Sequence, residues 1–163
     1  MRRGRSTGVA IGLGALSAVL LLGALGFQYL GRLPPCEMCL WQRWPHLGAA
    51  IVGLLGGGAI AAGMLGRGVA RPLAILTALL VALSGVIALY HAGVEWHWWL
   101  GPSQCTGSAF KYTGSLDLNA PAVMCDRAAW RLFGLSLAGY NAIISLGAAL
   151  IGLSVIARSR RTR

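Results

Sequence analysis

Residues 72–90 read PLAILTALLVALSGVIALY and contain no charged side chain. A helix of this length covers about 28 Å, which matches the roughly 30 Å hydrocarbon layer of a membrane. Three other segments, at about 8–30, 47–65 and 133–157, are at least as long and equally free of charge. With 56% hydrophobic and only 11% charged residues among 163, the chain lacks the charged surface of a soluble domain. The sequence therefore predicts an all-α fold, a four-helix transmembrane bundle that forms a single integral membrane domain.

The first apolar segment also has features of a signal peptide, because Arg2, Arg3 and Arg5 precede it. Its apolar run is longer than the roughly 7 to 15 residues of a usual signal core. We therefore expect segment 8–30 to be retained as a membrane anchor.

The basic residues predict how the chain is oriented in the membrane. Nine of the 14 lie before the first segment, between the second and third, or after the fourth, whereas all four acidic residues lie in the other two loops. Positively charged loops stay in the cytoplasm. Both termini are then cytoplasmic, and the loops at about 31–46 and 91–132 face the periplasm of a bacterial inner membrane. All four cysteines lie in these two loops, on the side where disulfides persist.

The net charge of +10 does not indicate a nucleic-acid partner. The basic residues stand at the ends of apolar runs and form no patch interleaved with aromatic residues, as nucleic-acid binding would need. The predicted partner is the lipid bilayer, with the C-terminal arginines touching anionic lipid.

The first two cysteines, Cys36 and Cys39, directly follow Pro35. Two intervening residues place the thiols one helical turn apart, and a proline fits the start of a helix there. The positive end of a helix favours a thiolate. On a continuous helix Arg43 shares a face with Cys39, where it could hold a thiolate or the anion of a reduced cofactor. Pro45 could instead interrupt the helix, so that the second span begins afresh.

Three interpretations of the four cysteines are available. A zinc site usually joins two closely spaced pairs, but 20 positions separate Cys105 from Cys125. Two inert disulfides would add little to a bundle that the bilayer already holds. A relay of two exchanging pairs is the favoured interpretation, and no metal site is expected. Four cysteines allow three pairings, so the sequence leaves the resting disulfide pattern open.

Redox potentials favour a quinone as the final electron acceptor. A structural disulfide has a potential below about −300 mV, whereas a strong periplasmic thiol oxidant sits near about −120 mV. Reoxidising that oxidant with an ordinary disulfide would cost roughly 8 kcal/mol. A lipid-soluble quinone could drain the electrons, and Cys39 lies at the mouth of the second span, where such a molecule could meet it.

Longer motifs around these cysteines resemble those of one family. They are Pro35-Cys36-x-x-Cys39-x-x-x-Arg43, the loop cysteines Cys105 and Cys125, Tyr90-His91-x-Gly93-x-Glu95-Trp96 and Cys125-Asp126-x-x-x-Trp130-x-x-x-Gly134-Leu135. Together with four spans, the motifs make the chain similar to the DsbB family of disulfide bond formation proteins over nearly its whole length. A C-x-x-C alone would be a weak signal, whereas this combination is specific.

The resemblance implies a membrane enzyme that converts protein dithiol plus quinone to protein disulfide plus quinol. Cys105 would be attacked by a periplasmic thioredoxin-fold dithiol oxidase of the DsbA type, and Cys125 would exchange with Cys36. Cys39 would then pass the electrons to ubiquinone or menaquinone, from the quinone pool of the respiratory chain. Arg43 would stabilise that state.

Gln42 and His91 are two further residues predicted to bind the cofactor. Gln42 stands where well-known members of the family carry an acid, so Arg43 is less neutralised and should favour a thiolate at Cys39. His91 could contact the quinone, or could bond to a carbonyl or water at the membrane interface. His46 and His97 are expected at that interface, and Glu95 and Asp126 are expected on the surface.

Two other functions remain as alternatives. A relay like that of vitamin K epoxide reductase would carry its C-x-x-C late in the chain, whereas here it is early. A non-catalytic transporter or assembly subunit would need polar groups inside its spans. These spans offer only scattered Ser and Thr with Gln28 and Asn141.

Overall fold

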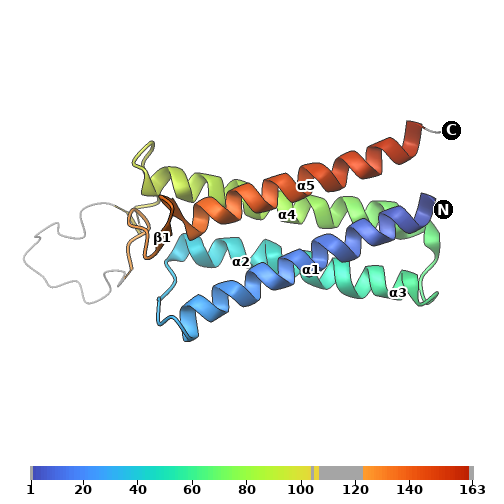
Figure 1. The fold of residues 1–163 in the computed structure, drawn as a ribbon, viewed down its shortest axis with the longest axis horizontal. Coiled ribbons are helices and arrows are strands. Elements are labelled where there is room, and N and C mark those ends of the chain that lie inside the picture. The colour runs from blue at the N-terminus through green and yellow to red at the C-terminus, as the bar shows by residue number, and fades with distance from the viewer. Residues whose placement is uncertain (1, 104, 107–122, 162–163) are drawn as a thin grey trace, which may run out of the picture.

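The computed structural model describes residues 2–103, 105–106 and 123–161, which form a helical bundle and a short hairpin (Figure 1). The helical elements are α1 (Arg2–Tyr29), α2 (Glu37–Ala50), the π-helical η1 (Ile51–Gly56), α3 (Gly57–Ala61), the 3-10 turn η2 (Arg67–Val69), α4 (Ala70–Glu95) and α5 (Leu137–Arg161). Because α2, η1 and α3 follow one another without a break, they make one long helix. In the described residues, four helices are long and apolar enough to cross a membrane, which confirms the predicted fold.

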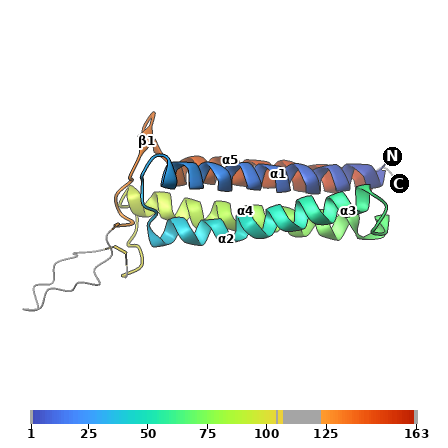
Figure 2. The ribbon, with the colours of Figure 1, turned by 90° about the horizontal axis from the view of Figure 1, so that it is seen from below.

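The long helices pack antiparallel in two layers, α1 with α5 and α2–α3 with α4 (Figure 2). α4 contacts each of the other three long helices. The start of α1 and the end of α5 lie at the same end of the bundle (Figure 1). The start of α2, with Cys36 and Cys39, and the described part of the segment between α4 and β1, with Cys105 and Cys125, lie at the opposite end (Figure 1). The hairpin lies at this cysteine end, where β1 (Arg131–Leu132) pairs antiparallel with β2 (Leu135–Ser136).

Small residues let the helices approach closely. A Cβ atom added to Gly53 would lie 2.8 Å from the Cα of Gly14 on α1, so neither position has room for a side chain. Large apolar side chains such as Leu22, Leu79 and Ile151 are instead exposed on the outside. Small residues inside and large apolar residues outside are the pattern of helices that pack together in lipid.

The helix boundaries differ from the predicted spans, and three of the differences involve a proline or a turn. The second helix begins at Glu37 instead of 47 and continues through Pro45, so the proline does not start a new helix. It ends at Ala61 instead of 65, because Gly63 adopts a positive φ of 77° that stops the helix. The fourth helix begins at Leu137 instead of 133, because Phe133 and Gly134 form the hairpin turn with positive φ angles.

Candidate redox site

Cys36 and Cys39 lie at the start of α2, as the sequence predicts. Cys36 is the N-cap residue, and its Sγ accepts the backbone N–H of Cys39 at 3.3 Å. Both thiols are free, and Cys36 donates its S–H to the Sγ of Cys39 at 2.8 Å. This hydrogen bond, together with burial, raises the pKa of the Cys36 thiol well above its ordinary value. Cys36 therefore keeps its proton, and Cys39 is the sulfur that receives the hydrogen bond.

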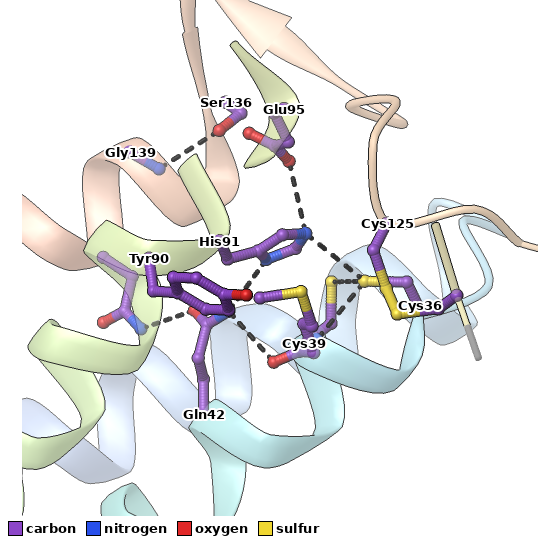
Figure 3. A network of polar contacts seen from close by, with 12 residues as sticks. Cys36, Cys39, Gln42, Tyr90, His91, Glu95, Cys125, Ser136 and Gly139 are labelled. Carbon is purple, nitrogen blue, oxygen red and sulfur yellow. Dashed lines mark hydrogen bonds and ion pairs between the residues drawn. A yellow bond between two sulfur atoms is a disulfide. The ribbon is translucent and has the colours of Figure 1, made fainter. Parts of the chain in front are cut away.

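The other two cysteines form a disulfide between Cys105 and Cys125, with 5.3 Å between their Cα atoms. Of the three pairings that the sequence allows, the structure has this one together with the free pair at the start of α2. The disulfide packs in one buried cluster with Cys36, Met38 and Val94. Cys125 lies beside Cys36 in Figure 3, so the two cysteine pairs meet at one place.

His91 on α4 faces the free pair. Its Nε2 lies 3.5 Å from the Sγ of Cys36 and 3.6 Å from the Oε1 of Glu95, while its Nδ1 accepts a hydrogen bond from the Nε2 of Gln42 at 2.9 Å (Figure 3). Because Nδ1 is an acceptor here, the ring proton of the neutral imidazole is on Nε2 and points toward Cys36 and Glu95. Gln42 and His91, which the sequence singles out separately, thus contact each other.

Gln42 extends this contact into a buried polar chain through the bundle. Its Oε1 accepts from the Nδ2 of Asn141 at 2.9 Å, and the Oδ1 of Asn141 is 2.9 Å from the Nε2 of His46. The Nδ1 of His46 is in turn 3.2 Å from the Oγ of Ser17 on α1. Polar groups buried in an apolar bundle are stable when each has a partner, and this chain provides one for every member.

Two of the expected surface positions are therefore wrong. His46 is only 4% exposed and Glu95 only 5%, so neither is an interfacial or surface residue. His97, by contrast, is exposed. The missed signal is helical spacing: His46 follows Gln42 by four residues and Glu95 follows His91 by four, which places each pair on one buried face.

An apolar groove of about 350 Å³ lies beside the free pair, between α1, α2 and α5. Its few polar lining residues are Cys39, Gln42, Arg43, His46, Tyr140 and Asn141. Arg43 donates from Nη1 to the Oε1 of Gln28 at 2.5 Å, but its buried Nε has no partner in the described part of the chain. A small movement of the Arg43 side chain would let this N–H donate to an oxygen atom of an apolar ligand in the groove.

A second, smaller cavity of about 40 Å³ shares part of its lining with the groove, including Pro34, Cys39 and Leu137. Cys39 lines both the groove and this cavity, whereas Cys36, His91 and Glu95 line the cavity alone. The ligand atoms of Cys36, Cys39 and His91 all lie within 4.8 Å of one another, close enough to hold one metal ion.

Comparison with known proteins agrees with this arrangement. The family model of the disulfide bond formation protein DsbB matches residues 6–155. The chain is 29% identical to disulfide bond formation protein B of Polaromonas sp. (strain JS666), over 91% of this chain and 90% of the relative. It is 31% identical to the protein of the same name from Pasteurella multocida, over 90% of this chain and 85% of the relative. No solved structure matches. The chain therefore belongs to the DsbB family of disulfide bond formation proteins, as a multi-pass membrane protein with two cysteine pairs at one end of its bundle.

Proposed function

We propose that this protein is a thiol:quinone oxidoreductase, which reoxidises a thioredoxin-fold dithiol oxidase of the DsbA type and passes the electrons to a quinone. One observation carries the proposal: Cys39 borders an apolar groove, while its neighbour Cys36 packs against the Cys105–Cys125 disulfide. Electrons that enter at the disulfide therefore have a short path through two thiols to a site that suits a lipid-soluble acceptor.

The first step is exchange with the partner. A thiolate of the partner attacks Cys105, and the partner's second thiol then closes the partner's disulfide, which leaves Cys105 and Cys125 as thiols. Cys125 next attacks Cys36 of an oxidised Cys36–Cys39 pair, which re-forms Cys105–Cys125 and releases Cys36 and Cys39 as thiols. Each exchange moves two electrons and creates no net disulfide. The structure, with Cys105–Cys125 bonded and two free thiols, corresponds to the state after this exchange.

The second step is the loss of two electrons from the free pair. A ubiquinone or menaquinone in the groove would supply a two-electron, two-proton acceptor. Arg43 would orient it through the unused Nε–H, and Cys39 would face it from the rim of the groove. Cys36 holds its proton against Cys39 until the disulfide between them closes.

The sidedness of the site follows from the same proposal. The cysteine end would face the periplasm and the termini the cytoplasm, as the distribution of basic residues predicts. The partner would then dock at the periplasmic surface of the inner membrane, over the Cys105–Cys125 disulfide.

Quinone reduction by purified protein, supplied with a reduced thioredoxin-fold dithiol, tests the function. The wild type should turn over, and both Cys39→Ser and Cys105→Ser should lose turnover because each interrupts the relay at one end. If the wild type reduces neither ubiquinone nor menaquinone analogues while it remains folded, the enzyme interpretation is wrong and the cysteines are structural.

A further inference from the structure

We infer that the reduced pair, Cys36 and Cys39, forms a Zn²⁺ site with His91, and that Glu95 supplies the fourth ligand. Zn²⁺ would hold the pair in its reduced state and stop electron transfer until the ion leaves. The binding site follows from the geometry alone, whereas its regulatory effect rests on the proposed function.

The distances already resemble those of a tetrahedral zinc site. With Zn–S near 2.3 Å and Zn–N near 2.05 Å, tetrahedral ligands lie about 3.6 Å apart for sulfur and nitrogen and about 3.8 Å apart for two sulfurs. The Sγ of Cys36 is 3.5 Å from the Nε2 of His91, and 2.8 Å from the Sγ of Cys39. The two sulfurs must separate by about 1 Å, which loss of the S–H···S hydrogen bond would bring about.

Glu95 lies next to His91 and could complete the site by moving toward the sulfurs, because its carboxylate oxygens are not within 4.8 Å of all three other ligand atoms. Its Oε1 lies 3.6 Å from the Nε2 of His91, close to the roughly 3.4 Å expected between nitrogen and oxygen ligands. Its Oε2 is buried and has no hydrogen-bond partner among the described residues. A buried carboxylate oxygen without a partner is costly, so binding an ion there would relieve that cost. Glu95 and the three other ligands all line the cavity of about 40 Å³, which has room for one ion.

The surrounding charges suit such a complex. Two thiolates, one carboxylate and Zn²⁺ carry a net charge of −1. Arg127 lines the same cavity, and Arg131 donates to the backbone carbonyl of Glu95 at 3.5 Å. Zn²⁺ is a borderline-soft ion that prefers sulfur and imidazole ligands in tetrahedral geometry. It therefore matches this ligand set better than Mg²⁺ or Ca²⁺ does.

Gln42 lets His91 become a ligand. To bind an ion through Nε2, the imidazole must move its proton to Nδ1, which then needs an acceptor. Rotation of the Gln42 side-chain amide by half a turn would present Oε1 to Nδ1 in place of Nε2. It would give up the hydrogen bond from Nε2 to the Met38 carbonyl, and Asn141 would turn its own amide to match. An amide at position 42 therefore supports both forms of His91.

Binding balances without an oxidant or reductant. Cys36 and Cys39 each lose one proton, two Zn–S bonds form, and two protons enter solution. The two sulfurs keep their electrons, so the pair cannot close its disulfide while the ion is bound. Oxidised protein has no thiolates to offer and should not bind.

Cobalt titration of the full-length protein in detergent tests the site directly. Cys105→Ser/Cys125→Ser serves as the background, so that the free pair contains the only thiols, which are reduced with a phosphine. One equivalent of Co²⁺ should give a sulfur-to-cobalt charge-transfer band of a tetrahedral complex, and Zn²⁺ should displace it. Prior oxidation of the pair should abolish the band.

Two matched histidine variants identify the nitrogen ligand. His91→Asn should weaken Co²⁺ binding about tenfold or more, whereas the exposed His97→Asn should leave it unchanged. Asn tolerates the positive φ of 59° at position 97. Glu95→Gln, which preserves the shape of the side chain, gives a second test with a smaller expected loss. Absence of the band in the reduced protein, or equal binding by the two histidine variants, would overturn the inference.

Quinone reduction measured in parallel separates the two proposals. A wild-type protein that reduces quinone but binds no Co²⁺ refutes the metal site alone. A protein that binds Co²⁺ but reduces no quinone refutes the proposed function and leaves the site standing. If both proposals hold, Zn²⁺ should inhibit turnover and a chelator should restore it.

Discussion

Arg43 is the residue that would most clearly connect the bundle to the proposed acceptor in the groove. The Nη1 of its guanidinium donates a hydrogen bond to Gln28, while its buried Nε has no partner in the described residues. Hydrogen bonds from charged groups contribute about 1.5–3 kcal/mol, which corresponds to roughly a tenfold to hundredfold change in affinity.

Arg43→Met should therefore raise the KM for quinone about tenfold or more in a turnover assay. Arg71→Met, an exposed position at the other end of the bundle, is the matched control and should keep the wild-type KM. An unchanged KM in Arg43→Met would show that the groove does not bind the acceptor through this side chain.

Gln42 provides a second prediction at the scale of the residue. Gln42→Glu adds a negative charge one position from Arg43 and near Cys39, so the thiolate of Cys39 should become less populated. Alkylation of Cys39 at neutral pH, located by mass spectrometry, should slow several-fold. Gln42→Met removes the amide without adding charge and separates the two effects. Equally fast alkylation in Gln42→Glu and the wild type would contradict this electrostatic account.

The sequence predicts the positions of some site residues correctly and those of others wrongly. Local spacing predicts that a helix starts at Cys36 and that Cys39 lies one turn further along it. The structure has that helix. His46 and Glu95 lie near the ends of apolar runs in the sequence, and that position does not show on which face of a helix they lie. Their partners come from other helices, and only the packed bundle brings those together.

At the scale of the element, apolar runs predict helices well and their ends poorly. The charge-free run at 72–90 lies inside α4, which continues to Glu95 because buried His91 and Glu95 extend its inner face. The hairpin at 131–136 was missed because Phe133 and Leu135 continue an apolar run, although Gly134 allows the turn. Hydropathy measures transfer to lipid, whereas the end of a helix depends on backbone angles and partners.

The contact between Gly14 and Gly53 gives a prediction for the packing of α1 on the second long helix. Gly53→Ala places a Cβ against the backbone of α1 and should destabilise the protein by about 1–3 kcal/mol. Gly58→Ala, on the same helix with nothing within 4 Å of its added Cβ, should be neutral or slightly stabilising. Thermal unfolding in detergent compares the two. Equal melting temperatures for both variants would contradict the close packing.

At the scale of the whole molecule, the bundle separates a basic end from a cysteine end. The described termini lie together and away from the cysteines, which is the arrangement that four antiparallel spans require (Figure 2). The arrangement itself follows from the sequence, because an even number of spans returns the chain to the side where it began. The sequence does not predict the pairing of Cys105 with Cys125 or their contact with Cys36, because both depend on how the connecting segment folds.

Reporter fusions test the predicted orientation in a bacterial cell. A fluorescent protein fused after Arg163 should fold and fluoresce, while alkaline phosphatase at the same site should be inactive, because that end is expected in the cytoplasm. Phosphatase inserted after Leu100 should be active. The opposite pattern would place the cysteines in the cytoplasm and remove the oxidising environment that the relay needs.

In the proposed function, the Cys36–Cys39 pair gives its electrons directly to a quinone in the groove. A single-turnover experiment tests this transfer: protein with a reduced Cys36–Cys39 pair and an intact Cys105–Cys125 disulfide is mixed with quinone in the absence of any partner. We predict one equivalent of quinol with the loss of both alkylatable thiols, and no quinol from Cys39→Ser. No quinol from the wild type, or quinol formed while Cys36 and Cys39 remain alkylatable, would contradict the proposal.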